Sequence, residues 1–159
     1  MKPVNKLLPS LILTLVMLTG LAYAASLLPT NDTAETGAAE PGGVVVEVDN
    51  LRNARGNVVV LVFDAADAYA RFDYNRAVAV DVLPAKQGSV RVAFPELDRG
   101  PYAVVLYHDE DGDYELAMDG ENPIEGYGVS GSRDAYHEPS FDEAAIAPGL
   151  VTVSVFYLP

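Results

Sequence analysis

The sequence predicts an all-β fold, an antiparallel immunoglobulin-like or transthyretin-like β-sandwich of about seven strands with one short helical segment. Short β-branched and aromatic runs recur from residue 44 to the end of the chain, and Gly, Pro, Asn and Asp separate them. No repeat of fixed period is visible, which argues against a solenoid or a propeller. We therefore expect a single domain over residues 44–159, preceded by two segments, 1–24 and 25–43, that lie outside it.

The N-terminus has the three parts of a secretory signal peptide. Lys2 and Lys6 precede an uncharged apolar run over residues 7–21, and residues 22–24 supply a small-x-small cleavage site. The run is shorter than the roughly 20 apolar residues that a membrane-spanning helix needs. We expect cleavage at the end of that site, a flexible linker over residues 25–43, and a secreted or periplasmic protein that does not span the membrane after cleavage.

The composition is strongly acidic. The chain has 23 Asp and Glu residues against 10 Lys and Arg residues, a formal net charge of −13. This balance argues against nucleic acid and anionic lipid as partners, because their binding depends on Lys and Arg neutralising phosphates. It favours cations, although the charge could also serve only to keep the protein soluble. The absence of Cys excludes disulfides and a lipoprotein anchor.

The strands are expected in the following order along the chain. Residues 58–63 form a central strand, because they are apolar on both faces and β-branched. The other strands are expected at residues 44–48, 77–83, 89–94, 102–106 and 150–158. In two of them one face is apolar, so we expect Val78, Val80, Val82, Val90, Val92 and Phe94 to point inward. Residues 84–88 are expected to join their two strands as a hairpin.

The pattern of strands is broken over residues 64–77. Asp64, with Asp67 three residues later, is expected to cap one short helix that carries Tyr69 and Phe72. Both aromatic side chains would then lie against the sheet, and this helix would form a lid over it.

An acidic loop follows the apolar strand at residues 102–106. Asp109, Asp111 and Asp113 alternate around Gly112, so successive carboxylates can turn toward one point. Ca²⁺ prefers such clusters because it is a hard ion that takes about six to eight oxygens. Further ligands are expected from Glu115, Asp119, Glu121 or backbone carbonyls. We therefore expect a calcium site with a dissociation constant of about 10⁻⁴ to 10⁻³ M, and no other cofactor.

This loop begins like an EF-hand loop but is not one. Its sixth position, where that loop requires Gly, is Tyr114, and its twelfth, which needs a bidentate Glu, is Gly120. The alternative is an acidic turn stabilised by its own Asp side chains and holding no ion, because Asp and Gly are ordinary turn residues.

A second group of candidate residues surrounds the acidic loop. Its members are His108, Glu125, Gly126, Tyr127, Gly128 and Ser130. His108 ends a strand beside Asp109, so we expect it to hydrogen-bond the loop and fix its backbone. The glycines are expected in turns with positive φ, with Tyr127 as a packing anchor, or else close to a ligand or to the acidic loop.

The order of these motifs resembles a known family. Leu97-x-x-Gly100-x-Tyr102, the segment 108–113, Pro123-x-Glu125-Gly126-Tyr127-Gly128-Val129-Ser130 and Pro139-x-Phe141-Asp142 together resemble the secreted bacterial domain of unknown function 2141, over roughly residues 44–157. The resemblance implies a small extracytoplasmic β-sandwich and supplies no established activity. Members usually carry a His-Asp-Glu-Asn-Gly-Asn-Gly-Lys-Leu-Asp loop. This chain departs from that loop at Asp111, Asp113, Tyr114 and Ala117.

Taken together, the motifs favour a non-enzymatic binding module. Its acidic loop would be ordered by calcium, and its partner would be an envelope protein, a peptide or a glycan. The alternative is a small extracytoplasmic hydrolase that uses His108 or His137 with nearby carboxylates, although no Gly-x-Ser-x-Gly elbow accompanies them. Two further alternatives are a transition-metal site on the same histidines and a sandwich that assembles through open edge strands.

Overall fold

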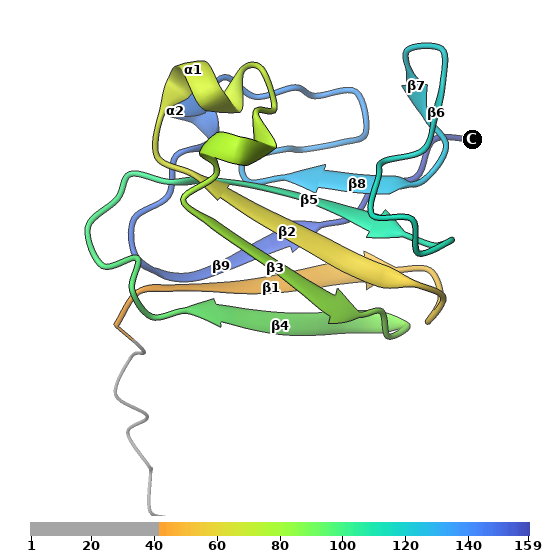
Figure 1. The fold of residues 1–159 in the computed structure, drawn as a ribbon, viewed down its shortest axis with the longest axis horizontal. Coiled ribbons are helices and arrows are strands. Elements are labelled where there is room, and N and C mark those ends of the chain that lie inside the picture. The colour runs from red at the N-terminus through yellow and green to blue at the C-terminus, as the bar shows by residue number, and fades with distance from the viewer. Residues whose placement is uncertain (1–41) are drawn as a thin grey trace, which may run out of the picture. The chain divides into compact units, whose positions relative to one another are not determined.

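A computed structural model describes residues 42–159, and two β-sheets packed face to face form its framework (Figure 1). The first sheet has the order β4-β1-β9 and the second the order β3-β2-β5-β8. The strands of the first sheet are β4 (Gly88–Phe94), β1 (Val44–Leu51) and β9 (Gly149–Ser154). Those of the second are β3 (Ala79–Pro84), β2 (Asn57–Phe63), β5 (Ala103–Asp109) and β8 (Gly126–Val129). The all-β sandwich predicted from the sequence is therefore confirmed.

The strands pair antiparallel except at one place. β1 runs parallel to β9, with Val46 opposite Val151, whereas its other neighbour β4 is antiparallel. Two short strands, β6 (Met118–Asp119) and β7 (Asn122–Pro123), form a separate hairpin that stands above the start of β8 (Figure 1).

The core lies between the two sheets and consists mainly of valine. Val44, Val46 and Val48 of β1 face Val58 and Val60 of β2, and all five side chains are fully buried. β2 lies between β3 and β5 and its other face is also buried, as expected for a central strand.

The outer face of the second sheet carries a second apolar cluster. Leu61 and Phe63 of β2 lie beside Val105 and Tyr107 of β5. This face is covered by the helices α1 (Ala66–Tyr69) and α2 (Phe141–Ala144), with the 3-10 helix η1 (Tyr74–Arg76) beside them (Figure 1). Tyr69 is buried and meets Phe63 edge to face at 6.3 Å between ring centroids. The expected lid is thus present for Tyr69 but not for Phe72, which lies beyond the end of α1 and is 49% exposed.

The predicted capping of α1 is wrong. The residue before the helix is Ala65, which makes no side-chain capping bond. Asp67 instead pairs with Arg71 at 2.8 Å and with Arg76 at 2.5 Å. A second helix, α2, was not expected from the sequence.

The sequence nevertheless contains a start signal for α2. Ser140 accepts from the backbone of Glu143, whose carboxylate accepts in return from the Ser140 backbone, so the two form a complete capping box.

The inward face predicted for β3 is also wrong. Val78, Val80 and Val82 are 39%, 51% and 39% exposed, while Ala79 and Leu83 pack on the inner core. The prediction that side chains alternate between the two faces is correct, but the valines were assigned to the covered face. An edge strand with apolar residues on both faces gives no local indication of which face other elements cover.

The connection over residues 84–88 is not a hairpin either. β3 pairs with β2 and β4 pairs with β1, so this segment crosses from the second sheet to the first.

The predicted signal peptide and almost all of the predicted linker lie outside the described residues. Within residues 42–159, no helix is both long enough and apolar enough to cross a membrane.

Candidate functional site

The acidic loop begins at the last residue of β5 and is organised by one buried carboxylate. Asp109 is fully buried, and its Oδ1 accepts from the backbone N–H of Gly112 at 2.7 Å and of Asp113 at 3.2 Å. Its Oδ2 accepts from the Tyr114 N–H at 3.2 Å and from the Asn57 amide at 3.4 Å. Four donors therefore compensate the buried charge, and the carboxylate holds the turn closed around itself.

A second buried carboxylate binds both ends of the same loop. Glu125, which is 6% exposed, directly precedes β8. Its Oε1 accepts from the Glu110 N–H at 2.7 Å and its Oε2 from the Ala117 N–H at 3.2 Å. Glu125 thus clamps residues 110 and 117 together from the neighbouring strand.

Tyr114 stands where an EF-hand loop requires Gly, and it adopts the conformation that favours Gly. Its φ is 66°, a value that is uncommon and strained for an aromatic residue. Its carbonyl accepts from the Tyr107 hydroxyl at 2.7 Å, and its N–H is held by Asp109. These bonds keep the backbone in place and leave the Tyr114 side chain 62% exposed at the edge of the loop.

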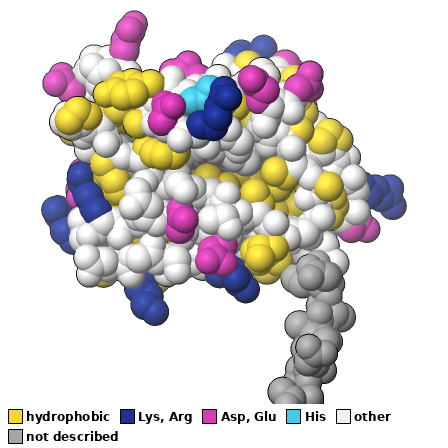
Figure 2. All heavy atoms as spheres, turned by 180° about the vertical axis from the view of Figure 1, so that it is seen from behind, with side chains coloured by type: hydrophobic (Ala, Val, Ile, Leu, Met, Phe, Trp, Pro, Cys, Tyr) yellow, Lys and Arg dark blue, Asp and Glu magenta, His cyan; other side chains and the backbone are white. Residues whose placement is uncertain are grey.

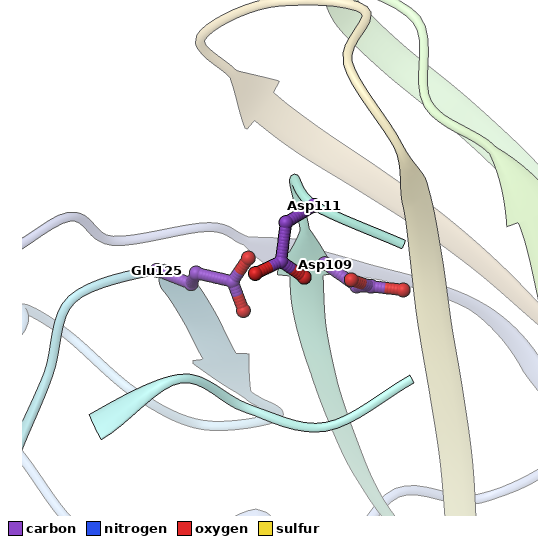
Figure 3. Close-up of side chains that lie close together, drawn as sticks. All are labelled: Asp109, Asp111 and Glu125. Carbon is purple, nitrogen blue, oxygen red and sulfur yellow. The ribbon is translucent and has the colours of Figure 1, made fainter. Parts of the chain in front are cut away.

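Three carboxylates converge within this loop. Asp109, Asp111 and Glu125 each offer an oxygen, and these oxygens lie within 4.8 Å of one another between the end of β5 and the start of β8 (Figure 3). The predicted ligands Asp113, Glu115 and Asp119 are not part of this group. Asp113 instead accepts from the Glu115 N–H at 2.8 Å.

The oxygens of these three carboxylates suit a hard cation, but backbone N–H groups already bind some of them. Ca²⁺ accepts carboxylate oxygens as ligands. Asp109 and Glu125 keep free lone pairs on their oxygens, and Asp111 is exposed to solvent. However, the N–H donors already relieve the repulsion between the two buried carboxylates. The loop therefore does not require an ion to close. Asp111 accepts one hydrogen bond, from the Asp113 N–H at 3.2 Å, so its carboxylate charge is the least compensated of the three and the most available to a cation.

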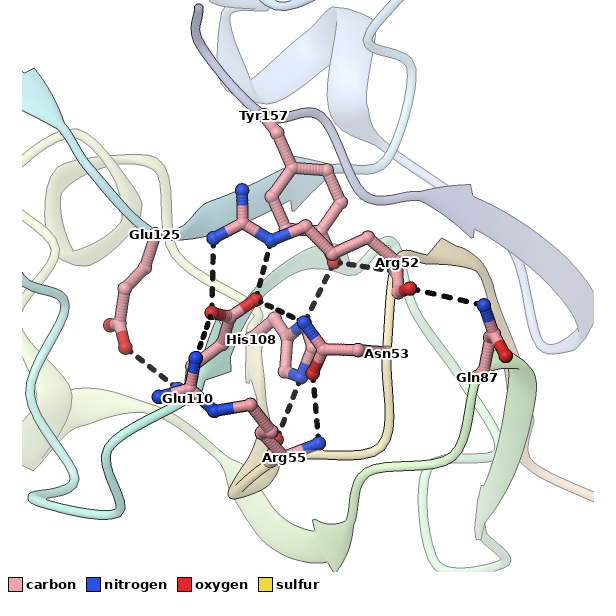
Figure 4. A network of polar contacts seen from close by, with 8 residues as sticks. All are labelled: Arg52, Asn53, Arg55, Gln87, His108, Glu110, Glu125 and Tyr157. Carbon is pink, nitrogen blue, oxygen red and sulfur yellow. Dashed lines mark hydrogen bonds and ion pairs between the residues drawn. The ribbon is translucent and has the colours of Figure 1, made fainter.

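His108 lies beneath the loop and is fully buried (Figure 4). Its Nε2 lies 2.9 Å from the carbonyl oxygen of Arg55, which can only accept, so Nε2 carries the proton. Nδ1, at 2.7 Å from the Tyr157 hydroxyl, then accepts. That hydroxyl in turn accepts from the backbone N–H of Arg52 at 3.1 Å. Both ring nitrogens are therefore hydrogen-bonded, but to Arg55 and Tyr157 and not to the acidic loop, so the expected hydrogen bond from His108 to that loop is wrong. From the loop, Glu110 approaches the ring, with its Oε1 3.6 Å from Nδ1.

An ion pair continues the network outward. Arg52 donates to both oxygens of Glu110, at 2.5 and 3.0 Å, and its guanidinium stacks 4.3 Å above the Tyr157 ring centroid (Figure 4). Asn53 adds a third donor at 3.0 Å. The hydrogen bond from Arg52 is the main cause that lowers the pKa of Glu110 below its ordinary value. The sequence did not identify Arg52 or Tyr157, which lie far from the loop along the chain.

Of the predicted binding residues after Glu125, Gly126, Gly128 and Ser130 are buried, whereas Tyr127 is half-buried and reaches the outer face of the second sheet. Gly126 and Gly128 lie within β8. An added Cβ would stand 2.3 Å from the Tyr157 ring at Gly126 and 2.3 Å from the Ser154 carbonyl oxygen at Gly128. Ser130 is 1% exposed and donates to the Ala144 carbonyl at 2.6 Å. Close packing, not a positive φ, explains these two glycines.

A groove that the sequence did not indicate lies on the outer face of the second sheet. It has a volume of about 1170 Å³ and is open to solvent. Its aromatic lining consists of Tyr69, Phe72, Tyr74, Tyr107, Tyr114, Tyr127 and Phe141. Helices α1 and α2 border it, as do the acidic loop and the β6–β7 hairpin. The volume exceeds the usual range of small-molecule sites, about 300 to 1000 Å³.

The walls of the groove are tied to each other by tyrosine hydroxyls. Tyr69 of α1 donates to the Pro139 carbonyl at 2.6 Å, and Tyr127 of β8 donates to the Ala135 carbonyl.

From the side opposite to that of Figure 1, hydrophobic side chains are visible in a hollow across the molecule, with a histidine and a basic side chain above it (Figure 2). The aromatic surface is therefore built into the scaffold.

The family comparison bears directly on this loop and groove. A family model described as "Uncharacterized protein conserved in bacteria (DUF2141)" matches residues 46–153, more than half of the chain. The chain belongs to this family. The resemblance noted from the sequence motifs is thereby confirmed, and the matched DUF2141 region includes both sheets, the acidic loop and most of the groove. No curated protein and no solved structure matches the chain.

The histidines of this DUF2141 member form no hydrogen-bonded pair with a serine nucleophile within residues 42–159. Both ring nitrogens of His108 are engaged. His137 Nε2 lies 2.8 Å from the Arg133 guanidinium, so it accepts. Ser132 donates to the His137 carbonyl and Ser140 is used in the capping box of α2. Among the described residues, therefore, no serine hydroxyl is hydrogen-bonded to a histidine ring.

Proposed function

We propose that this chain is a non-enzymatic, extracytoplasmic binding module that takes its ligand into the aromatic groove. The observation that carries the proposal is the groove itself, a large open depression with seven aromatic residues in its lining. Binding sites are typically concave, mostly apolar and preformed, with few polar groups. Aromatic side chains suit this role because they provide contact area at low cost in conformational entropy.

The rim of the groove leaves apolar side chains exposed to solvent. Tyr114, Phe72 and Met118 are 62%, 49% and 49% exposed, and all three line the groove. Single exposed hydrophobic residues are ordinary, but a contiguous set around a depression marks an interaction site. A ligand that covers them removes this surface from water, which stabilises the complex.

The acidic loop forms one wall of the groove, and this gives calcium a role. A divalent cation bound by Asp111, with Asp109 and Glu125, would rigidify the turn that presents Tyr114. Ordering a binding loop before the ligand arrives reduces the entropy lost on binding. The partner we propose is an envelope protein, peptide or glycan that reaches the exported chain.

The test is a thermal-unfolding screen of the purified chain against panels of short peptides and oligosaccharides. Two variants accompany the wild type. Tyr114→Asn with Met118→Ala removes two rim side chains, and Asn suits the positive φ at position 114. Leu150→Ala removes an exposed apolar side chain of β9, a strand of the other sheet.

A ligand of the groove raises the unfolding temperature of the wild type and of Leu150→Ala but not that of the rim variant. Equal stabilisation of all three proteins would contradict the groove as the site. Turnover of an ester, peptide or glycoside that is lost in His137→Ala would instead favour the hydrolase alternative.

A further inference from the structure

The polar lining of the groove is acidic. Glu115, Glu121, Glu138 and Glu143 all line it, and the lining includes no Lys or Arg among the described residues. Glu143 is used in the capping box of α2. The other three make no ion pair within residues 42–159, because the ion pairs there use other carboxylates.

These carboxylates act on the aromatic rings of the groove. Burial is the largest cause that raises the pKa of Tyr74, and the charge of Glu115 adds to it. The pKa of Tyr127 is raised in the same way, mainly by burial and then by the charge of Glu138. For Tyr69 the causes are burial, then Glu138 and Glu143. Burial disfavours a charge of either sign, but the contribution of the carboxylates shows that their negative charge reaches the rings, and the same charge attracts a cation placed over them.

The rings add an attraction of their own. The face of a tyrosine or phenylalanine ring is electron-rich and attracts ammonium and guanidinium groups that lie within about 6 Å of its centroid. Tyr69 lies 6.1 Å from Phe72 and 5.9 Å from Phe141, centroid to centroid. This cluster lies on the side of the groove formed by α1 and α2, beside the segment that carries Glu138.

Acidic groups therefore stand on two sides of an aromatic floor. Glu115 and Glu121 come from the loop and hairpin side, and Glu138 comes from the segment before α2. A ligand with one charge would meet only one of these sides. A ligand with two or more positive charges, separated by apolar groups, can meet both and also cover the floor. The volume of about 1170 Å³ exceeds what a single small amine would fill.

We infer that the occupant of the groove is a short basic peptide in which Lys or Arg alternates with apolar side chains. The apolar side chains lie on the tyrosine floor, and the basic groups reach Glu115 and Glu138 across it. This inference rests on the proposed function, because it names the class of ligand that the same groove takes. It accounts for the absence of basic side chains from the lining.

The experiment measures fluorescence anisotropy of labelled hexapeptides titrated with the full chain. The probe alternates leucine with lysine, one control has glutamine in place of each lysine, and a second control is hexalysine. The test variant is Glu115→Gln with Glu138→Gln. A charge-matched variant, Glu96→Gln with Asp98→Asn, removes two exposed carboxylates from the turn between β4 and β5, away from the groove.

We expect the leucine–lysine peptide to bind most tightly. The groove variant should weaken it by about tenfold, and the charge-matched variant by less than about threefold, since exposed ion pairs are individually weak. Equal losses in both variants, or equal binding of hexalysine, would show attraction to the net charge alone and overturn the inference.

Two further outcomes separate this inference from the proposed function. If the glutamine peptide binds as tightly as the lysine peptide and both depend on Tyr114 and Met118, the groove is a binding site but the ligand is not basic. If free spermine binds as tightly as the peptide, the ligand is a polyamine, which overturns the peptide assignment. Failure of every peptide to bind overturns the inference, while the screen with oligosaccharides still tests the proposed function.

Discussion

The ring nitrogen Nδ1 of His108 lies 2.7 Å from the hydroxyl oxygen of Tyr157, 49 residues further along the chain. His108 is near the end of β5, and Tyr157 follows β9 of the other sheet, so this bond links the two sheets directly beneath the acidic loop. The hydroxyl also receives the Arg52 N–H, and Arg52 binds Glu110 of the loop. The base of the loop is thus held from both layers of the sandwich.

Tyr157→Phe removes one hydroxyl and leaves a buried imidazole nitrogen without its donor. Because a buried polar group that loses its partner costs about 1 to 3 kcal/mol, the free energy of unfolding should fall by that amount. Chemical denaturation followed by circular dichroism measures this. The control is Tyr136→Phe, since Tyr136 is 76% exposed. Equal stability of wild type and Tyr157→Phe would show that the His108 bond does not support the fold.

The stability of the protein should depend on Glu110 in mildly acidic solution. Its pKa in the folded protein is lowered, first by the hydrogen bond from Arg52, so folding favours the charged form. The stabilisation is therefore present above the ordinary pKa of about 4.5 and is lost as the pH falls through the lowered folded value. At neutral pH it should be about 1 kcal/mol, since Arg52 is partly exposed.

The measurement compares the free energy of unfolding of wild type and Glu110→Gln between about pH 7 and pH 3. The difference between the two proteins should shrink as the pH falls. A difference that stays constant over this range would mean that the charge of Glu110 does not contribute.

Calcium should stabilise the protein through Asp111 but not through its neighbour Asp113. With a dissociation constant of about 10⁻⁴ M, about 10 mM calcium adds roughly 2.7 kcal/mol relative to EDTA. For a domain of this size, this raises the unfolding temperature by on the order of 10 °C. Asp111→Asn should abolish the rise, and Asp113→Asn should retain it, because only Asp111 converges with Asp109 and Glu125. No rise in calcium, or an equal one in magnesium, would favour the ion-free turn.

Much of the fold was predictable because strand signals are local. The valine-rich run of β2 is apolar on both faces, and the structure places it in the middle of its sheet. The edge strand β3 was assigned the wrong face, since Val80 and Leu83 are both apolar and only the packing of other elements decides which is covered. The same reason hides the crossover after β3, which depends on partners and not on the turn sequence.

The candidate site was predictable only in part. The carboxylates of the loop are adjacent in the sequence, but Glu125 joins Asp109 because β5 and β8 pair. The groove depends even more than the carboxylate cluster on contacts between segments that are far apart in the sequence. Tyr69, Met118 and Phe141 come from three separate segments, and each alone has no pattern that indicates a binding site. The nine tyrosines in the sequence are consistent with an aromatic binding surface, but the composition alone does not show where in the fold such a surface lies.

The central claim is that ligand occupies the groove, and the methyl group of Met118 tests it most directly. The chain has three methionines, Met1, Met17 and Met118, so the methyl-labelled protein gives a simple spectrum, and Met118→Leu assigns the signal. Met118 lines the groove. Leu150, which does not line it, is the reference on β9 in a second sample labelled at the leucine methyl groups, in which Leu150→Ala assigns its signals.

The titration uses the ligand that raises the unfolding temperature most in the screen. We predict that this ligand shifts or broadens the Met118 methyl signal at saturation and leaves the Leu150 methyl signals in place. A ligand that binds while the Met118 signal stays unchanged, or that moves only Leu150, would contradict the account.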